Sequence, residues 1–417
     1  MRKKILFYLL LSSQCAFAQD FIEDTQTSLS TRNYYYDRNF TEQSNVSALK
    51  EWAQGFILNV ESGYTPGLIG LGLDVQAMAG FKLYADDLQT GAQLLPVNKS
   101  TREAADAYGE IGITAKAKYS ETELKVGTLM PFTPVLFASK ARLLPQVYRG
   151  AELKSKDLNQ SLITAGWLNK VNHRDSTDYE DIRITGANGK FIGAATDHVF
   201  YAGIEHNLDK KNLVGAYTAK VEDLYQQTVI MAKTEHDLNE HLAVLSDLKF
   251  YRSDEDGKER AGAVDNTLIA TNFSLKHDIH KFSFGILNSY GDTAFPYLTG
   301  GEVLFFLDGV STDFLNPKER VKSFRYDVDL KDFVEGLKFA ARYSKGNKIE
   351  LPAYGGNNLK EDEWAFDLQY SVPKYMKYIG GVNARARYAI YDNNFAPTSA
   401  FKPAQELRVA LDYTWKF

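Results

Sequence analysis

The sequence predicts an all-β fold, namely a transmembrane antiparallel β-barrel of about 18 strands. Aromatic residues make up 13 % of the chain and only 11 residues are Pro, a composition that favours the pleated surface of strands. Segments in which apolar and polar residues alternate recur along the chain. The mean hydropathy is −0.33 and no internal apolar run reaches about 18 residues, which excludes a helical membrane protein. A barrel is still allowed, because only every second residue of its strands faces lipid.

The N-terminus has the three parts of a secretory signal peptide. Residues 2–4 are basic, residues 5–11 are apolar, and Ala16-Phe17-Ala18 places small residues where signal peptidase reads them. We therefore expect a signal peptide at 1–18 and one barrel domain at 19–417. The alternative is a short buried helix.

The predicted mature chain has neither a cysteine nor a basic excess. Cys15, the only cysteine in the sequence, falls in the signal peptide, so an exported barrel would form without disulfides. The signal peptide holds 3 of the 48 basic residues and none of the 53 acidic ones, which leaves the remainder acidic. This balance argues against a nucleic-acid partner.

The alternation is clearest in two segments. In 68–83 the odd-numbered residues are apolar, and the even-numbered ones are mostly glycine or polar. In 406–417 the odd-numbered residues are again apolar, and most even-numbered ones are polar or charged. Weaker examples predict strands at 55–62, 108–119, 121–129, 161–169, 199–206, 242–251, 266–276, 280–289, 323–330, 336–345, 363–372 and 382–391.

The connections between these segments alternate between short and long, as in membrane barrels. Short turns are expected at Ser120 and at 334–336. Long loops are expected at 85–106, 130–160, 291–321, 346–361 and 392–404. No repeat of fixed length is present, contrary to a soluble propeller or solenoid. So many strands enclose more volume than side chains can fill, so the apolar face is expected to meet lipid and the polar face to line a lumen.

Nothing in the sequence indicates catalysis or a metal site. His236 and His241 are five residues apart, and His277 and His280 are three apart, so neither pair matches the helical metal-binding spacing. A G-x-S-x-G motif is absent. We therefore predict no enzyme, no catalytic residue, no metal and no cofactor, with a barrel lipid hydrolase as the enzymatic alternative.

The strongest candidate site is a set of arginines that share the luminal parity. Arg385 and Arg387 lie two apart on one strand, and Arg408 lies opposite the apolar face of the last strand. Arg32 and Arg38 share a parity near the start. Because a barrel closes by pairing its first and last strands, these side chains should meet on one wall. A row of guanidinium groups can bind carboxylates bidentately and pass them along a pore.

Further basic residues extend this prediction to the neighbouring strands. Lys338 and Arg342 have the luminal parity two strands before 382–391, and Arg325 has it one strand further back. The alternative is that all these groups are solvated luminal charges, partly paired with Glu363 or Asp367.

Several segments resemble one known family. They are RNYYYDRNF at 32–40, EWAQGFILNVESGYTPGLIGLGLD at 51–74, RLLPQVYRG at 142–150, GDTAFPYLTG at 291–300 and ARARYAIY at 384–391. In these segments the sequence resembles the OprD family of outer-membrane porins, which are substrate-specific carboxylate channels. The resemblance implies a monomeric barrel in the outer membrane of a Gram-negative bacterium. It also implies inward-folded extracellular loops, two of them at about 130–160 and 291–321.

The resemblance also implies particular site residues. The family's basic ladder falls on Arg38, Arg385, Arg387 and Arg408, and the opposing electronegative side falls on Asp313, with hydroxyls from Tyr297 and Tyr225. Lys50 lies beside another ladder position, Gln369 takes one usually held by Lys, and Lys140-Ala141 replaces a common acidic or polar residue. An acid facing the arginine wall would orient a solute that carries both a carboxylate and a cationic group.

We therefore expect a passive channel for small carboxylate-bearing solutes, such as amino acids or aromatic acids. Its partners would be these solutes, together with the lipid and lipopolysaccharide of the outer membrane. No ATP motif is present, so transport would run down a gradient. A plugged, structural or adhesive barrel is the main alternative, and it predicts no conductance.

Overall fold

The structure is a computed structural model that describes residues 21–42, 46–187, 190–303, 307 and 309–417. The predicted signal peptide at 1–18 lies outside the described residues.

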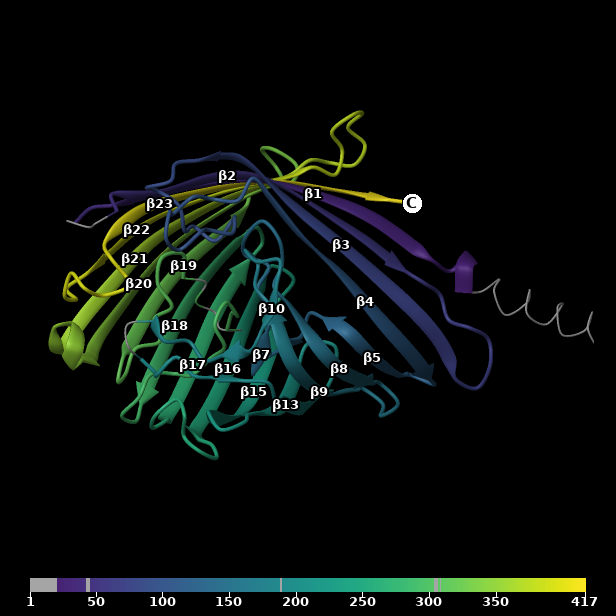
Figure 1. Cartoon of the computed structure of the whole chain (residues 1–417), viewed down its shortest axis with the longest axis horizontal. Helices are drawn as coiled ribbons and strands as arrows, with labels where there is room; N and C mark the ends of the chain where they lie inside the picture. Colours follow the sequence, from purple (N-terminus) through teal and green to yellow (C-terminus); the bar gives the residue numbers. More distant parts are fainter. Residues whose placement is uncertain (1–20, 43–45, 188–189, 304–306, 308) are drawn as a thin grey trace, which may run out of the picture.

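The chain folds into a closed antiparallel barrel of 18 long strands, as the alternation predicted (Figure 1). Each strand pairs with the next along the chain, and β1 pairs with β23, where Arg32 lies opposite Asp412. The wall consists of β1 (Gln26–Phe40), β2 (Ala48–Glu61), β3 (Gly70–Ala85), β4 (Ala107–Tyr119), β5 (Thr122–Leu129), β8 (Val147–Ser155), β9 (Ser161–Asn172), β13 (Val199–Asn207), β14 (Leu213–Val221), β15 (Tyr225–Asp237), β16 (Leu242–Glu255), β17 (Asp265–His277), β18 (His280–Tyr290), β19 (Arg320–Asp329), β20 (Leu337–Leu351), β21 (Gly356–Ser371), β22 (Asn383–Asn393) and β23 (Ala404–Lys416).

Short elements lie in the connections between these strands. They are β6 (Phe132–Thr133), β7 (Leu136–Phe137), β10 (Tyr179–Glu180), β11 (Ile182–Arg183), β12 (Ala195–Thr196) and the 3₁₀ helix η2 (Pro352–Tyr354). Within the described residues, no helix is both long and apolar enough to cross a membrane.

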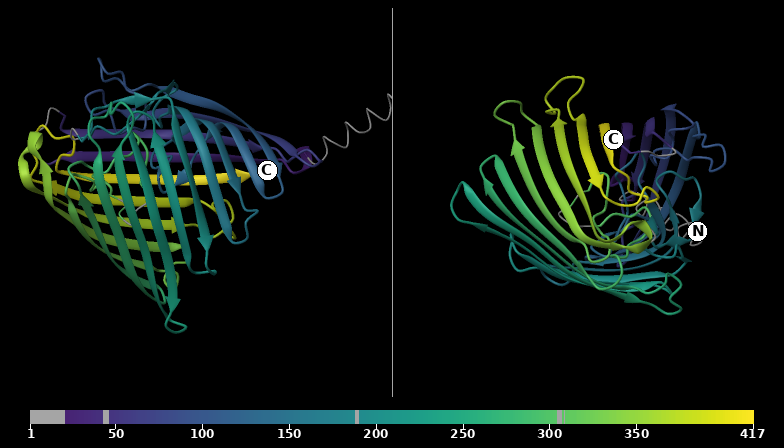
Figure 2. Two further views of the ribbon diagram at one scale, coloured as in Figure 1. Left: turned by 90° about the horizontal axis from the view of Figure 1, so that it is seen from below. Right: turned by 90° about the vertical axis from the view of Figure 1, so that its left-hand side faces the viewer.

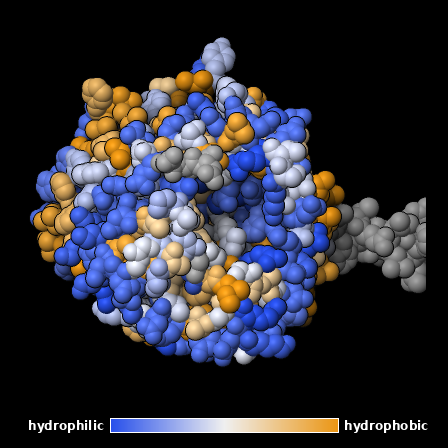
Figure 3. Space-filling view, turned by 60° about the vertical axis from the view of Figure 1, so that its left-hand side comes forward, coloured by the Kyte–Doolittle hydropathy of each residue, from blue (hydrophilic) through white to orange (hydrophobic). Residues whose placement is uncertain are grey.

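The two ends of the barrel differ (Figure 2). One end, called here the turn end, carries the C-terminus and the connections β2–β3, β4–β5, β17–β18 and the like. The other end, called the loop end, carries the longer connections, including β3–β4, β5–β8, β9–β13 and β18–β19. Figure 3 views the loop end, where a hollow with a largely hydrophilic wall opens into the barrel and apolar side chains gather at the margin.

The outer surface carries the apolar face of the strands. On β3, Leu71 is 56 % exposed and Phe81 is 43 % exposed, whereas the neighbouring Gly72 and Gly80 are buried. On β23, Leu411 and Trp415 face outward while Arg408 is buried on the luminal side. The predicted assignment of the two faces is therefore confirmed on both strands.

Two predicted loops are wrong in extent. The segment 130–160 contains β8, and the segment 346–361 is mostly β20 and β21, joined by η2. The sequence concealed both because the strand pairing is irregular there: β8 and β9 shift register between Arg149 and Gly150, and β20 and β21 shift register between Gly346 and Ile349.

Loops fold inward and pack against the inner wall. In the β18–β19 connection, Phe295 and Phe314 are buried among wall residues such as Tyr251. In the β5–β8 connection, Leu143 and Leu144 are buried against the wall near Tyr36. The lumen is thus narrowed by folded-in chain.

Candidate functional site

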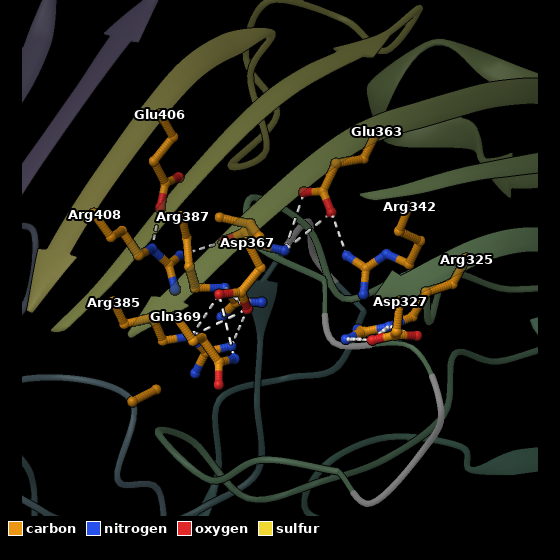
Figure 4. A network of polar contacts seen from close by, with 12 residues as sticks. Arg325, Asp327, Arg342, Glu363, Asp367, Gln369, Arg385, Arg387, Glu406 and Arg408 are labelled. Carbon is orange, nitrogen blue, oxygen red and sulfur yellow. Dashed lines mark hydrogen bonds and ion pairs between the residues drawn. The ribbon is translucent and has the colours of Figure 1, made fainter. Parts of the chain in front are cut away.

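The predicted arginine wall forms on neighbouring strands. Arg387 on β22 lies directly opposite Asp367 on β21 and Arg408 on β23 in the strand register. Arg385, two residues earlier on β22, lies opposite Gln369. All of these side chains point to the inside of the barrel (Figure 4). The period-two parity that predicted the row is therefore the parity that the strands adopt.

Asp367 pairs with both arginines of β22. Arg385 Nε donates to both carboxylate oxygens at 3.0 Å, and its second nitrogen donates to the same group. Arg387 Nε lies 3.6 Å from Asp367 Oδ2. The Arg385 side chain is 41 % exposed but the Arg387 side chain only 12 %. The alternative of charges paired with Asp367 thus holds for this part of the row, and Arg385 is the guanidinium most open to the lumen.

Arg408 and Arg38 are held by Glu406 on β23. Arg408 Nε donates to Glu406, and another of its nitrogens donates to the carbonyl of Val310. Arg38 Nε lies 3.7 Å from Glu406, and Arg38 also donates to the carbonyl of Lys402 at 3.2 Å. Arg408 is buried and binds the backbone of Val310, so it holds the β18–β19 connection in place in addition to contributing its positive charge.

The row of basic residues continues on β19 and β20, where each arginine again pairs with a nearby carboxylate. Arg342 donates to Glu363 at 2.8 Å, and both side chains are buried. Arg325 pairs with Asp327 two residues along its own strand. Lys338 lines a second cavity, of about 560 Å³, beside Arg325 at the turn end.

A cavity of about 390 Å³ lies between the arginine wall and the folded-in β5–β8 and β18–β19 connections. Its basic lining consists of Arg385, Arg387 and Arg408 together with Arg32 and Lys140. Its carboxylates are Glu302 from the β18–β19 connection and Asp412, which Arg32 already binds at 2.6 Å. The excess of basic over acidic side chains gives this cavity a positive field suited to anions.

The predicted acid Asp313 lies elsewhere and is already paired. Both of its oxygens accept from Lys190 Nζ, at 2.7 and 2.8 Å, and the Tyr297 hydroxyl donates to Asp313 Oδ2 at 2.8 Å. The Lys190 side chain is fully buried and that of Asp313 is 14 % exposed. Burial, followed by the charge of Asp313 and its hydrogen bond, raises the pKa of Tyr297 well above its ordinary value. The hydroxyl therefore stays protonated as a donor.

Tyr225 is not brought to this group. Its side chain is 1 % exposed and packs in the hydrophobic cluster between the inner wall and the folded-in loops. Lys50 pairs with Asp37 at 3.4 Å on the neighbouring strand, and Gln369 donates to Asp367 at 3.3 Å.

Sequence reasoning missed Glu302 and Lys190. Glu302 accepts a hydrogen bond from Ser139 at 2.5 Å, which joins the β18–β19 and β5–β8 connections beside the arginine cavity. Both residues lie in loops, where no period orients a side chain, and the partner of Lys190 is 123 residues away in the chain. No sequence signal could have located either.

The acidic residues of β21 and β23 also fasten loop chain to the wall. The segment 309–319, called here the strap, is the last part of the β18–β19 connection. Glu363 accepts from the backbone N–H groups of Val310 and Ser311, at 3.0 and 2.7 Å. Glu406 accepts from the Ser311 hydroxyl at 3.0 Å. The arginine wall and the strap are thus parts of one network.

No metal centre is indicated: within the residues that the structure describes, no group of three or more His, Cys, Asp or Glu side chains could hold a metal ion.

The fold and this site define a class of protein, a channel-forming barrel with an outer apolar surface, a charged lumen and loops that narrow it. The family model of the OprD outer-membrane porins matches residues 19–417. The chain therefore belongs to the OprD family of outer-membrane porins, and its place is the bacterial outer membrane.

Individual relatives agree with this assignment. The chain is 29 % identical to the porin-like protein GalP of Pseudomonas putida, over 95 % of this chain and 93 % of that one. It is 29 % identical to Porin D of Pseudomonas aeruginosa, over 83 % and 79 %. The crystal structure of OccAB2 from Acinetobacter baumannii is similar with a TM-score of 0.91 and 51 % identity, covering 95 % of this chain and 99 % of that one. The crystal structure of Pseudomonas aeruginosa OpdK with vanillate is similar with a TM-score of 0.86 and 30 % identity, covering 95 % and 100 %.

Proposed function

We propose that this porin is a passive channel selective for small solutes that carry a carboxylate, such as amino acids or aromatic acids. The observation that supports this most is the cavity of about 390 Å³ with Arg385, Arg387 and Arg408 along one side. Its size suits a small solute, and its guanidinium groups match a carboxylate in geometry and charge.

The arginines would act as a ladder. Arg385 is the most open of them, and Arg387 and Arg408 follow as direct register neighbours across β22 and β23. A carboxylate that moves from one guanidinium group to the next always keeps a positive partner. This lowers the free-energy barrier for its passage through the pore. The crystal structure of the relative OpdK contains vanillate, an aromatic carboxylate, which is consistent with this substrate class.

The acidic side of the passage is proposed to be Glu302, with Asp313 as the second candidate. Glu302 lines the same cavity as the arginines, whereas Asp313 is engaged by Lys190. A solute with an ammonium group would then lie across the cavity, with its carboxylate on the arginine wall. Because β1 closes onto β23 within one chain, a single copy suffices for the pore, and we propose a monomer in contact with outer-membrane lipid and lipopolysaccharide.

Liposome swelling with matched solutes tests the proposal. Benzoate and benzamide have nearly the same shape, but only benzoate carries a charge. The proposal predicts faster entry of benzoate through the porin at low salt, and a smaller advantage at high salt because ions screen the wall. Equal rates for the two solutes would contradict carboxylate selectivity, and no swelling with either would favour the plugged barrel.

A further inference from the structure

The four arginines that line the cavity of about 390 Å³ each bind a carboxylate of the barrel wall. Arg32 binds Asp412, Arg385 and Arg387 share Asp367, and Arg408 binds Glu406. The carboxylate of a solute has to share these partners. Lys140 is the remaining cation of the lining, and its side chain is exposed. Among the described residues, no carboxylate lies within ion-pair distance of its ammonium group, so Lys140 adds a positive charge that no described carboxylate offsets.

The backbone around Lys140 is fixed to the first strand of the wall. Arg32 on β1 donates to the carbonyl of Lys140 at 3.0 Å and to the carbonyl of Arg142 at 2.7 Å. The Tyr34 hydroxyl, also on β1, donates to the carbonyl of Ala141 at 3.2 Å. These bonds hold the β5–β8 connection beside the cavity, while the flexible stem of the lysine lets its ammonium group follow a solute.

Glu302, the acid that lines the cavity from the β18–β19 connection, is engaged by groups other than Lys140. The Ser139 hydroxyl donates to Glu302 Oε1 at 2.5 Å and accepts from Arg174 at 2.8 Å. The backbone N–H of Glu302 donates to the carbonyl of Phe137 at 3.1 Å. Arg174 is therefore one hydroxyl away from Glu302 and offsets part of its charge. The cavity thus offers an arriving anion two positive sites on different elements, the arginine wall and Lys140.

We propose that Lys140 is a specificity-determining residue that binds the second carboxylate of a solute whose first carboxylate lies on Arg385. Arg385 is the guanidinium most open to the lumen, with 41 % of its side chain exposed, and it lines the same cavity as Lys140. The inference rests on the proposed selectivity for carboxylates and narrows it to small dicarboxylates. A monocarboxylate occupies one of the two positive sites, whereas a dicarboxylate occupies both. Lys140 gives up no carboxylate partner when it binds the second group.

Block of the channel by matched anions tests the inference. Terephthalate and 4-carbamoylbenzoate have nearly the same shape, but terephthalate carries a second carboxylate where the other anion carries an amide. The readout is the concentration of each anion that halves the potassium chloride current of single channels in a planar bilayer at low salt. We expect wild type to require about ten-fold less terephthalate, and the difference to shrink at high salt. Equal concentrations would overturn the inference, while a retained advantage of benzoate over benzamide in liposome swelling would leave the proposed function standing.

Two variants assign the preference to Lys140. Lys140→Gln should require about as much terephthalate as 4-carbamoylbenzoate, and it should keep the advantage of benzoate over benzamide. Lys99→Gln is the control and should keep the preference for terephthalate, because Lys99 is exposed on the β3–β4 connection and lies outside the lining of the cavity. A preference that survives in Lys140→Gln, or that both variants lose equally, would contradict the role of Lys140.

Charge reversal adds a gain that a misfolded channel cannot produce. Lys140→Glu places a carboxylate where the second carboxylate of the solute would bind. This variant should be blocked by less 4-(aminomethyl)benzoate, which carries a carboxylate and an ammonium group, than terephthalate, and by about the same ten-fold factor. A Lys140→Glu channel that still binds terephthalate more tightly would overturn the assignment.

Discussion

In the proposed channel, Asp367 competes with a solute's carboxylate for the guanidinium groups of the arginine wall. Its carboxylate binds both Arg385 and Arg387, so one acid on β21 occupies the two guanidinium groups of β22. An arriving carboxylate has to share or displace this partner. The exposed Arg385 keeps its charge near the lumen even while it is paired, which makes exchange between the two carboxylates feasible.

Asp367→Asn should therefore strengthen the anion preference of the channel. The substitution removes the competing charge and leaves the arginines in place, so benzoate should enter faster and the reversal potential in a salt gradient should move toward that of anions. Asp362→Asn is the matched control, because Asp362 lies on the same strand with the opposite parity. If both variants shift the reversal potential equally, Asp367 has no special place in the passage.

Substitutions of Glu302 and of Asp313 should have different effects on the passage of solutes with a cationic group. Glu302→Gln should slow arginine relative to benzoate in liposome swelling, because Glu302 faces the arginine cavity. Asp313→Asn should instead leave the buried ammonium of Lys190 without its counter-charge, a loss of about 3–5 kcal/mol in comparable buried pairs. An arginine-to-benzoate ratio changed by Asp313→Asn, but not by Glu302→Gln, would return the acidic role to Asp313.

At the scale of elements, the strap depends on two buried carboxylic acids, Glu319 and Glu361. Glu319 Oε2 and Glu361 Oε1 both accept from the side-chain amide of Asn316, at 3.0 and 2.7 Å. Glu361 also accepts from Thr312 and Tyr391, each at 2.6 Å. Burial, and next the charge of Glu361, raises the pKa of Glu319 well above its ordinary value, with Lys190 opposing the shift. The docked strap therefore favours the protonated form of Glu319.

Docking of the strap should weaken as pH rises. A group whose pKa is raised in the folded state stabilises that state below its ordinary pKa, and this contribution is lost as pH rises through the raised value. Closures and noise in single-channel recordings should thus increase as pH rises above the ordinary Glu pKa of about 4.3. Glu319→Gln keeps the hydrogen-bonding shape without the charge and should abolish the trend, whereas Glu350→Gln, an exposed control, should retain it. A trend unchanged by Glu319→Gln would exclude the pair as its cause.

The sequence predicts the strands and the luminal arginines, but it does not predict how the strap binds the wall. Strands with one face in lipid and one in the lumen, such as β3 and β23, can be predicted from the alternation of apolar and polar residues. The same alternation predicts on which face their arginines lie. The strap network joins loop residues to wall residues far apart in sequence, as when Ser311 binds Glu406. Such contacts depend on how a loop folds, and no local pattern encodes them. Asp313 was identified from the resemblance, but its partner Lys190 required the structure.

At the scale of the whole molecule, the apolar outer surface should tolerate charge far less than the lumen. Leu71→Lys places a cation on the lipid face of β3 and should cost about 2–4 kcal/mol near the bilayer midplane. Gln76→Lys, on the luminal side of the same strand, should fold normally. Gly72 is unsuitable as the control, because a side chain there would collide with Lys116 and with the backbone of Gly63. Heat-modifiable gel mobility reports folding, and equal tolerance at positions 71 and 76 would contradict this orientation of the barrel.

The central claim is that the arginines of β22 set the selectivity of the pore. The most direct measurement is the reversal potential of single channels in a planar bilayer under a potassium chloride gradient, for wild type and for Arg385→Ala/Arg387→Ala/Asp367→Asn. The triple variant removes both guanidinium groups together with the acid they bind, so no unpaired carboxylate is left behind. The account predicts that the reversal potential shifts toward cations and that benzoate loses its advantage over benzamide. A triple variant with the reversal potential and benzoate preference of wild type would contradict it.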